Sequence, residues 1–176
     1  MPFPVPDSAA LATLLPAACR DKQGRPFTVR ILLQDDRAAL EGFYDAFEPK
    51  RGAHGLPPIG ADRVARWLDS VLPDGVHLIA EAEAAMVGHG LLMPTRQDGV
   101  GEWAIFLARE DRGHGIGTGM NRIAVEVSRA LGLRKLWLSV EPHNRAAVRS
   151  YEKVGFRFLP SAIFSLEAEM ELELEL

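Results

Sequence analysis

A glycine-rich turn between an expected strand and an expected helix restricts this 176-residue chain more than any other feature. The segment Arg112–Thr118 reads RGHGIGT, with glycine at the alternate positions Gly113, Gly115 and Gly117. Glycine has no Cβ, so its backbone amide can approach a ligand closely. The first amides of the following helix have no partner within the helix, and the helix dipole adds positive potential there. The turn therefore predicts a site for a phosphate or pyrophosphate.

The spacing of this turn excludes two better-known phosphate loops. A Walker loop needs Gly-Lys followed by Ser or Thr, whereas Gly117 is followed by Thr-Gly. The dinucleotide fingerprint G-x-G-x-x-G also fails, because its last position falls on Thr118 when counted from Gly113 and on Met120 when counted from Gly115. A tight strand-to-helix turn without a ligand is a second interpretation. It accounts for one glycine more easily than for three.

Hydrophobic periodicity predicts strands and helices that alternate around one sheet. We expect helices over residues 36–47, 61–72, 117–131 and 144–153, and strands over residues 27–33, 76–81, 86–93, 102–108, 135–140 and from 156 onward. The predicted class is α/β (α+β), a single domain with a central mixed, mostly antiparallel sheet of six or seven strands flanked by about four helices.

The first 26 residues predict a proline-containing N-terminal extension with one helix docked on the body, and residues 27–176 predict the domain. The longest apolar stretch, Ala9–Cys19, is shorter than the ~20 residues of a membrane-spanning helix. No Lys or Arg precedes it, so we do not expect an export signal. Cys19 is the one cysteine, which fits a reducing cytoplasm. We therefore expect a cytoplasmic protein that does not bind membranes.

Charge is distributed unevenly along the chain, whose net charge is -4. Five glutamates alternate with apolar residues over 166–176, and this period of two predicts a strand with one charged face in water. Basic residues outnumber acidic ones over residues 129–157. This basic region suits a small phosphorylated ligand better than a long nucleic acid. Nucleic acid is therefore not an expected partner.

Two motifs in the same order resemble those of the GNAT superfamily, the acyl-CoA-dependent N-acetyltransferases. The spacing Arg112-x-x-Gly115-x-Gly117 at a helix start resembles its motif A. Residues 141–156 read EPHNRAAVRSYEKVGF, which is similar to its closing motif with Asn near a helix start and Tyr-Glu-Lys-x-Gly-Phe at the end. The resemblance runs from about residue 27 to the C-terminus. It implies a GNAT-like domain over residues 27–176 that uses acetyl-CoA as co-substrate.

The resemblance also implies how acetyl-CoA is held. The strand that ends at Leu107 and Ala108 is expected to splay at a bulge, so that the pantetheine arm pairs with its edge. The Leu107 amide would polarise the thioester carbonyl. Asn144 would contact the pantetheine arm or a nearby backbone group. Amides of the turn, with Arg112 nearby, would hold the pyrophosphate. The implied cofactor-binding residues are Leu107, Ala108, Arg112, Gly113, Gly115, Gly117, Thr118 and Asn144.

Acyl transfer to an amine needs a base, because an alkylamine with a pKa of ~10.4 is protonated at neutral pH. Glu102 starts the strand that leads to the glycine turn and could take this proton directly or through water. The strand resembles that of bacterial protein-lysine acetyltransferases, which read Ala-Glu-Phe-Ala and use this Glu as base. Tyr151 resembles the superfamily tyrosine that protonates the leaving thiolate. A solvent-exposed strand-end carboxylate and a core tyrosine are the structural alternatives.

In this superfamily the connection between the first two helices lies over the acceptor site. The implied acceptor contacts are Tyr44, Glu48, Lys50 and His54. The histidines show no metal-ligand spacing, so we expect no metal.

The sequence thus predicts an acetyl-CoA-dependent N-acetyltransferase that acts through a direct ternary complex. Its acceptor is a primary amine, either of a small molecule or of a protein lysine. A non-catalytic acyl-CoA-binding or sensing module and a nucleotide-phosphate-binding protein are the alternatives. The acidic tail strand leaves open whether it pairs within its own chain or across a homodimer.

Overall fold

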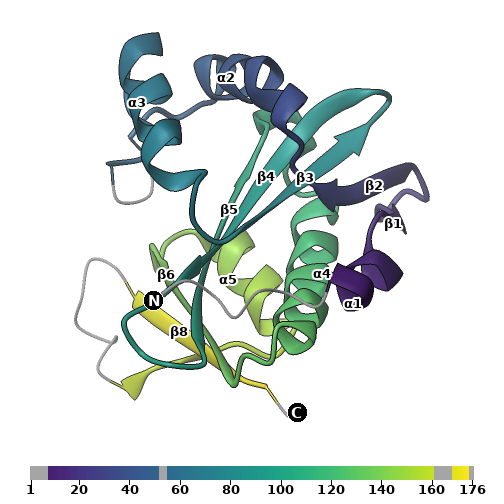
Figure 1. Ribbon diagram of the computed structural model, residues 1–176, viewed down its shortest axis with the longest axis vertical. Helices are drawn as coiled ribbons and strands as arrows, with labels where there is room; N and C mark the ends of the chain where they lie inside the picture. Colours follow the sequence, from purple (N-terminus) through teal and green to yellow (C-terminus); the bar gives the residue numbers. More distant parts are fainter. Residues whose placement is uncertain (1–7, 52–54, 161–167, 175–176) are drawn as a thin grey trace.

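The computed structural model describes residues 8–51, 55–160 and 168–174. These residues form one eight-stranded sheet in the order β1-β2-β3-β4-β5-β6-β8-β7 (Figure 1). The strands are β1 (Ala17–Arg20), β2 (Pro26–Ile31), β3 (Val76–Ala82), β4 (Ala85–Pro94), β5 (Val100–Leu107), β6 (Lys135–Val140), β7 (Arg157–Phe158) and β8 (Ala168–Glu173). The helices are α1 (Ser8–Leu14), α2 (Arg37–Ala46), α3 (Ala61–Val71), α4 (Ile116–Ala130) and α5 (Arg145–Glu152), with short 3-10 turns η1 (Gln34–Asp36) and η3 (Arg109–Asp111).

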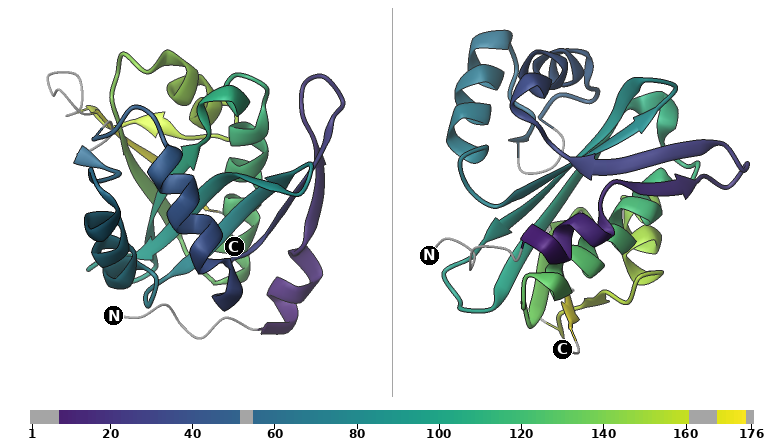
Figure 2. Two further views of the ribbon diagram at one scale, coloured as in Figure 1. Left: turned by 90° about the horizontal axis from the view of Figure 1, so that it is seen from above. Right: turned by 45° about the vertical axis from the view of Figure 1, so that its right-hand side comes forward.

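Helices cover both faces of the sheet (Figures 1 and 2). On one face, α2 and α3 enclose a core that includes Leu40, Tyr44 and Leu68. On the other face, α1, α4 and α5 enclose a larger core around Met120 and Leu136. Among the described strands, only β5 and β6 run parallel. The predicted class is confirmed, with one strand more than the upper expectation.

The added strand is β1, which pairs antiparallel with β2 at the edge of the sheet. The apolar stretch that begins before it divides between α1 and β1, and α1 packs against α4. Leu11 and Leu15 are buried there. The periodicity of the sequence had predicted one helix and no strand in this region, because four strand residues are too few to show an alternation.

The acidic tail forms β8, and its alternation is as predicted. Ala168 and Met170 are buried and Glu169 is exposed. The strand lies inside the sheet, between β6 and β7, and Lys135 Nζ of β6 lies 2.8 Å from carboxylate oxygens of both Glu171 and Glu173. The tail therefore pairs within its own chain over these residues. The alternating residues 166, 167, 175 and 176 lie outside the described part of the chain.

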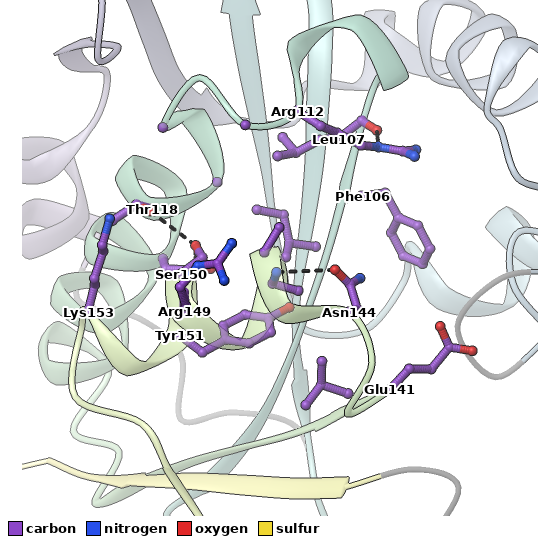
Figure 3. Close-up of a pocket in the computed structure, with 18 of the residues that line it drawn as sticks. Phe106, Leu107, Arg112, Thr118, Glu141, Asn144, Arg149, Ser150, Tyr151 and Lys153 are labelled. Atoms are coloured by element: carbon purple, nitrogen blue, oxygen red, sulfur yellow. Dashed lines mark hydrogen bonds between the residues drawn. The ribbon is translucent and has the colours of Figure 1, made fainter.

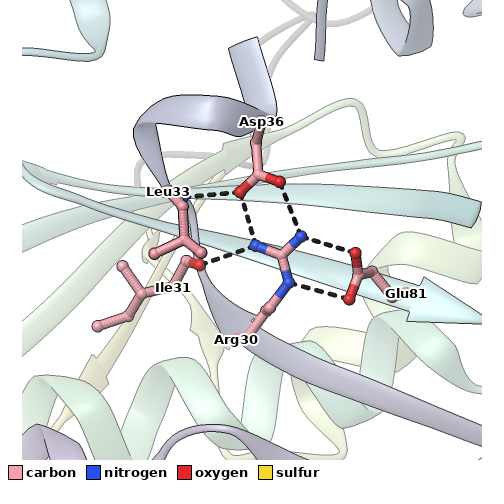
Figure 4. A network of polar contacts seen from close by, with 5 residues as sticks. All are labelled: Arg30, Ile31, Leu33, Asp36 and Glu81. Carbon is pink, nitrogen blue, oxygen red and sulfur yellow. Dashed lines mark hydrogen bonds and ion pairs between the residues drawn. The ribbon is translucent and has the colours of Figure 1, made fainter. Parts of the chain in front are cut away.

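An arginine between two carboxylates fixes the passage from β2 into α2 (Figure 4). Arg30 donates to both oxygens of Asp36 at 2.6 and 2.8 Å and to both oxygens of Glu81 on β3 at 2.9 and 2.6 Å. Asp36 also accepts the Leu33 backbone N–H at 2.7 Å. Hydrogen bonds from Arg30 lower the pKa of both carboxyl groups. Such bidentate pairs are specific in geometry, so they hold the start of α2 against the sheet.

A buried chain of three polar side chains crosses the core beneath α2. The Tyr44 hydroxyl lies 2.6 Å from His89 Nδ1, and His89 Nε2 lies 3.1 Å from His77 Nδ1. His77 Nε2 lies 3.1 Å from the Val71 carbonyl and 2.9 Å from the Asp74 carbonyl. Burial lowers the pKa of both histidines, so both are neutral. Carbonyls only accept, so His77 Nε2 carries the single proton of its ring and its Nδ1 accepts from His89, whose Nδ1 then accepts from Tyr44.

A second buried relay joins β5 to α4 and α5. Trp103 Nε1 donates to Asn121 Oδ1 at 2.8 Å, and Asn121 Nδ2 donates to Ser150 Oγ at 2.9 Å. Ser150 Oγ lies 3.2 Å from Thr118 Oγ1 at the first turn of α4. A Cβ on Gly90 of β4 would lie 2.1 Å from Trp103 Cη2, so a glycine is needed to seat the indole. The relay fixes the two helices relative to the strand.

The neutral histidines predict a loss of stability in mild acid. Burial lowers the pKa of both, that of His89 to about 3, whereas unfolded histidines titrate at ~6.5. As the pH falls below ~6.5, the unfolded chain binds protons that the folded chain does not, and this loss continues down to about 3. Urea titrations should show that the His89 contribution lowers the free energy of unfolding by about 2 kcal/mol from about pH 7.5 to about pH 5.

The variant His89→Gln isolates this effect, because glutamine offers one acceptor and one donor but does not titrate. Its free energy of unfolding should depend less on pH than that of the wild type. His143→Gln is the matched control, since the His143 side chain is 81% exposed. An unchanged pH dependence in His89→Gln would contradict the assignment.

The Trp103–Asn121–Ser150 relay predicts a stability loss when its centre is made apolar. Asn121→Leu keeps the size of the side chain but leaves the buried indole N–H of Trp103 without a partner. We expect the free energy of unfolding to fall by about 2–3 kcal/mol in denaturant titrations. Asn144→Ala removes one exposed helix cap and should cost about 1 kcal/mol. Equal losses in the two variants would argue against the relay.

Candidate functional site

The site begins where β5 and β6 separate. Their parallel register covers three pairs, from Val100–Lys135 to Glu102–Trp137, while β5 stays paired with β4 as far as Leu107. The remaining edge of β5 therefore faces a gap. A pocket of about 480 Å³ occupies this gap, lined by β5, β6, α4, α5 and the glycine turn (Figure 3). Its volume lies within the range typical of small-molecule sites.

The glycine turn at one end of the pocket needs glycine for two different reasons. Gly113 and Gly115 have φ angles of +80° and +100°, which side-chain-bearing residues rarely adopt. Gly117 has an ordinary backbone, but a Cβ there would lie 3.0 Å from Leu107 Cδ1. All three glycines line the pocket. The turn thus keeps its backbone open to the pocket and lets α4 approach β5 closely.

The first turn of α4 directs free amides to this place. Gly115 is the N-cap, and its carbonyl accepts the first helical hydrogen bond from Gly119 N–H at 3.0 Å. The N–H groups of Ile116, Gly117 and Thr118 therefore have no acceptor in the preceding turn of helix. Together with the helix dipole, they make this end of the pocket suited to an anion, which is the role that the sequence predicts for the turn. We call the glycine turn and this first turn of α4 the cradle.

Besides Arg112, three cationic side chains line the pocket, namely Lys22, Arg149 and Lys153. Arg149 lies in α5 and Lys153 follows that helix, and both belong to the basic region noted in the sequence (Figure 3). None of the three forms an ion pair with an acidic side chain in the described ranges. Sequence reasoning missed Lys22, because this residue precedes the expected domain. The positive charge suits a phosphorylated ligand.

Arg112 lines the pocket, and its side chain also holds two other segments together. Its Nε donates to the Leu107 carbonyl at 3.0 Å, and its Nη2 donates to the Glu48 carbonyl. The guanidinium also lies 5.0 Å from the ring centroid of Phe47. The side chain thus fastens the segment after α2 to the end of β5. Desolvation lowers the pKa of Arg112.

Leu107 is oriented as the predicted oxyanion contact requires. The N–H of Ala108 donates to the Val87 carbonyl of β4 at 2.9 Å. Successive amides of a strand point in opposite directions, so the Leu107 N–H points away from β4, into the gap. The expected bulge is absent from the pairing of β4 with β5 over the described residues, which keeps register up to Leu107. The edge opens because β6 diverges. Ala108 does not itself line the pocket.

Tyr151 and Asn144 both line the α5 side of the pocket (Figure 3). The Tyr151 ring is buried against Phe156, with ring centroids 5.8 Å apart, and burial raises the pKa of its hydroxyl. This hydroxyl has no hydrogen-bond partner among the described residues. Asn144 caps α5, since its Oδ1 accepts the Ala147 N–H at 3.2 Å. The Tyr151 side chain therefore belongs to the core and still reaches the pocket.

Glu102 occupies the last position at which β5 pairs with β6. Its side chain is exposed and does not line the pocket. Because side chains alternate along a strand, Glu102 shares a face of the sheet with Phe106, which does line the pocket. This face is the one covered by α2 and α3. Glu102 therefore lies at the point where β5 and β6 begin to separate, and not inside the gap between them.

Two of the expected acceptor contacts, Tyr44 and Lys50, have other partners in the structure. Tyr44 is fully buried, and its hydroxyl is bonded to His89, so it belongs to the core. Lys50 Nζ donates to the carbonyls of Tyr44 and Asp45, which caps the last turn of α2. Neither side chain lines the pocket.

Glu48, a third expected contact, does not line the pocket either. The Glu48 side chain is exposed, and His54 lies outside the described residues. Instead, Phe47, Pro49 and Leu56 of the same connection form part of the wall. The polar side chains of Glu48 and Lys50 thus face solvent or cap α2, while the apolar side chains of this connection face the pocket.

The described residues hold no group of three His, Cys, Asp or Glu side chains able to bind a metal ion. No helix in the described ranges is long and apolar enough to cross a membrane.

Comparison with known proteins points to one family. A model described as the acetyltransferase (GNAT) family matches residues 37–156. The mycothiol acetyltransferase of Streptomyces avermitilis is 31% identical over 134 residues, which cover 73% of this chain and 42% of that protein. The chain thus spans about 40% of the length of the curated relatives it matches.

Solved structures agree on the fold. The GNAT domain of S. lividans PAT has a TM-score of 0.74 and 21% identity, and the match covers 90% of this chain and 96% of that one. The yncA protein of Salmonella typhimurium, whose structure holds its cofactor acetyl-CoA, has a TM-score of 0.67 and 19% identity, covering 85% and 94%. Because the family model covers more than half of the sequence, this chain belongs to the acetyltransferase (GNAT) family.

Proposed function

We propose that this chain is an acetyl-CoA-dependent N-acetyltransferase that transfers acetyl to a primary amine in a direct ternary complex. The observation that carries the proposal is the pocket between β5 and β6. It combines an anion cradle, a free strand edge at Leu107 and the hydroxyl of Tyr151 in a member of this family. The mycothiol acetyltransferase relatives and the structural neighbour that holds acetyl-CoA support the same activity.

The residues present fit acetyl-CoA, which would supply the acetyl group as a thioester. Amides of the turn and of the first turn of α4 would hold the pyrophosphate, since the first amides of a helix have no acceptor within that helix. The edge of β5 would pair with the amides of the pantetheine arm as an added strand does. The Leu107 N–H would then donate to the thioester carbonyl and favour the charge that develops on its oxygen. Asn144 lines the same stretch of the pocket.

Tyr151 is the proposed general acid. A phenol whose pKa is raised by burial stays protonated at neutral pH, and its hydroxyl has no competing partner in the described chain. It can therefore donate to the sulfur of the leaving thiolate.

Glu102 is the proposed general base. It lies where β5 and β6 begin to separate, on the same face of the sheet as Phe106. An amine that enters from the α2 side would therefore pass between Glu102 and Phe106. A water molecule can carry the proton over the remaining distance. Phe47, Leu56 and Phe106 give this entrance an apolar wall. The names of the curated relatives favour a mycothiol-related acceptor, and a protein lysine is the other acceptor class to be tested.

Release of CoA thiol from acetyl-CoA tests the activity and the base together. The assay would include separate pools of small amines and lysine peptides. With the productive pool, Glu102→Gln should lower kcat by about 10²-fold, because glutamine cannot accept a proton. Glu126→Gln, on the exposed face of α4, should retain full activity. Binding of acetyl-CoA without turnover in any pool would favour a non-catalytic acyl-CoA-binding module instead.

Tyr151→Phe tests the acid separately. The change removes one hydroxyl that has no partner in the described chain, so the free energy of unfolding should shift by less than about 0.5 kcal/mol. We expect kcat to fall by roughly 10²-fold and the Kd for acetyl-CoA, measured by calorimetry, to stay the same. An unchanged kcat would assign protonation of the thiolate to another group.

A further inference from the structure

The turn between β1 and β2 touches the glycine turn, although the two are about 90 residues apart in sequence. The Lys22 N–H donates to the His114 carbonyl at 2.8 Å, and Lys22 Nζ donates to the Gly113 carbonyl at 2.9 Å. Lys22 Cγ lies 3.0 Å from the position that a Cβ on Gly115 would take. The lysine side chain thus passes close to Gly115 and ends beside Gly113.

The hairpin that carries Lys22 is internally braced. The Asp21 carboxylate, with 2% of its side chain exposed, accepts the backbone N–H groups of Gln23 at 2.8 Å and Arg25 at 2.9 Å and the Nε of Arg25 at 2.7 Å. Arg25 Nη2 lies 3.1 Å from His114 Nδ1. These bonds hold the backbone around Lys22 in place on the glycine turn. The fixed backbone helps to position the ammonium group at the end of a flexible side chain.

The charge of Lys22 is available to a ligand. Its described partner is a neutral carbonyl, and the side chain is exposed and lines the pocket. Arg149 of α5 and Lys153, the residue that follows α5, also line the pocket (Figure 3). An anion seated on the cradle amides would therefore experience the positive charge of all three side chains.

We propose that Lys22 is a phosphate-binding residue of this site, whose ammonium group contacts the pyrophosphate of acetyl-CoA. The proposal rests on the proposed function, because it needs acetyl-CoA to bind in this pocket. The pyrophosphate is chosen because Lys22 Nζ is bonded to Gly113, in the turn whose amides would hold that group. Lys22 lies before the segment that the family model matches, so the hairpin ahead of that segment would complete the cradle.

Calorimetric titration of the full chain with acetyl-CoA tests the contact without turnover. Lys22→Met should raise the Kd by about tenfold, the effect of losing one charge-assisted hydrogen bond. It should also weaken the salt dependence of the Kd, because one fewer ion contact is screened. Lys22→Arg restores the charge and should stay within about threefold of the wild type. Arg20→Met is the matched control, since Arg20 is an exposed cation of the same hairpin that donates to the Gly24 carbonyl.

The same variants titrated with dephospho-CoA locate the contact, because this ligand keeps the pyrophosphate and lacks the 3′-phosphate. A tenfold effect that persists supports the pyrophosphate assignment, and an effect that disappears overturns it in favour of the 3′-phosphate. Equal Kd values for wild type and Lys22→Met overturn the proposal. A weaker Kd that Lys22→Arg does not restore, together with a lower Tm of the ligand-free protein, would show a bracing role instead. Wild-type protein that binds no acetyl-CoA would defeat the proposed function itself.

Discussion

The short parallel contact between β5 and β6 is the constraint on which the rest of the site depends. It ends at Glu102 and Trp137. Beyond this point β6 no longer pairs with β5, which leaves the outward amides of β5 available to a ligand. The relay from Trp103 through Asn121 to Ser150 ties the splayed strand to α4 and α5. A continuous parallel ladder would pair the Leu107 N–H with β6 and close the pocket. Packing and hydrogen bonds of the surrounding elements thus keep the gap open.

The two faces of the sheet contribute different chemistry to this gap. The face of α4 and α5 supplies free amides, cations and the Tyr151 hydroxyl. The face of α2 and α3 supplies aromatic walls above a buried and neutral polar chain. Arg112 joins the two, because its guanidinium bonds both the end of β5 and the segment after α2. In the proposed reaction, the acyl donor and the amine acceptor would accordingly approach one strand from opposite sides.

Local pattern was sufficient for most of the elements and for the strand-to-helix position of the glycine turn. The apolar periodicity of α4, the alternation of β6 and β8 and the Asn144 cap of α5 all appear in the structure as expected. Tyr44 shows where such reasoning fails. It is an aromatic residue in a helix before a polar loop, and this position suggests contact with a ligand. In the structure its hydroxyl instead forms a buried hydrogen bond with His89 Nδ1, 45 residues away in the chain. No local pattern predicts this bond.

The sequence by itself determined the glycine turn, most of the strands and helices and the family, because each depends on residues that are close together in the chain. Glycine is required where φ is positive, and no distant contact is needed to recognise this. The tertiary structure decided where β5 leaves β6, where the guanidinium of Arg112 points and that Lys22 reaches the cradle. These outcomes depend on pairing and burial between distant segments, whose energies no local pattern records.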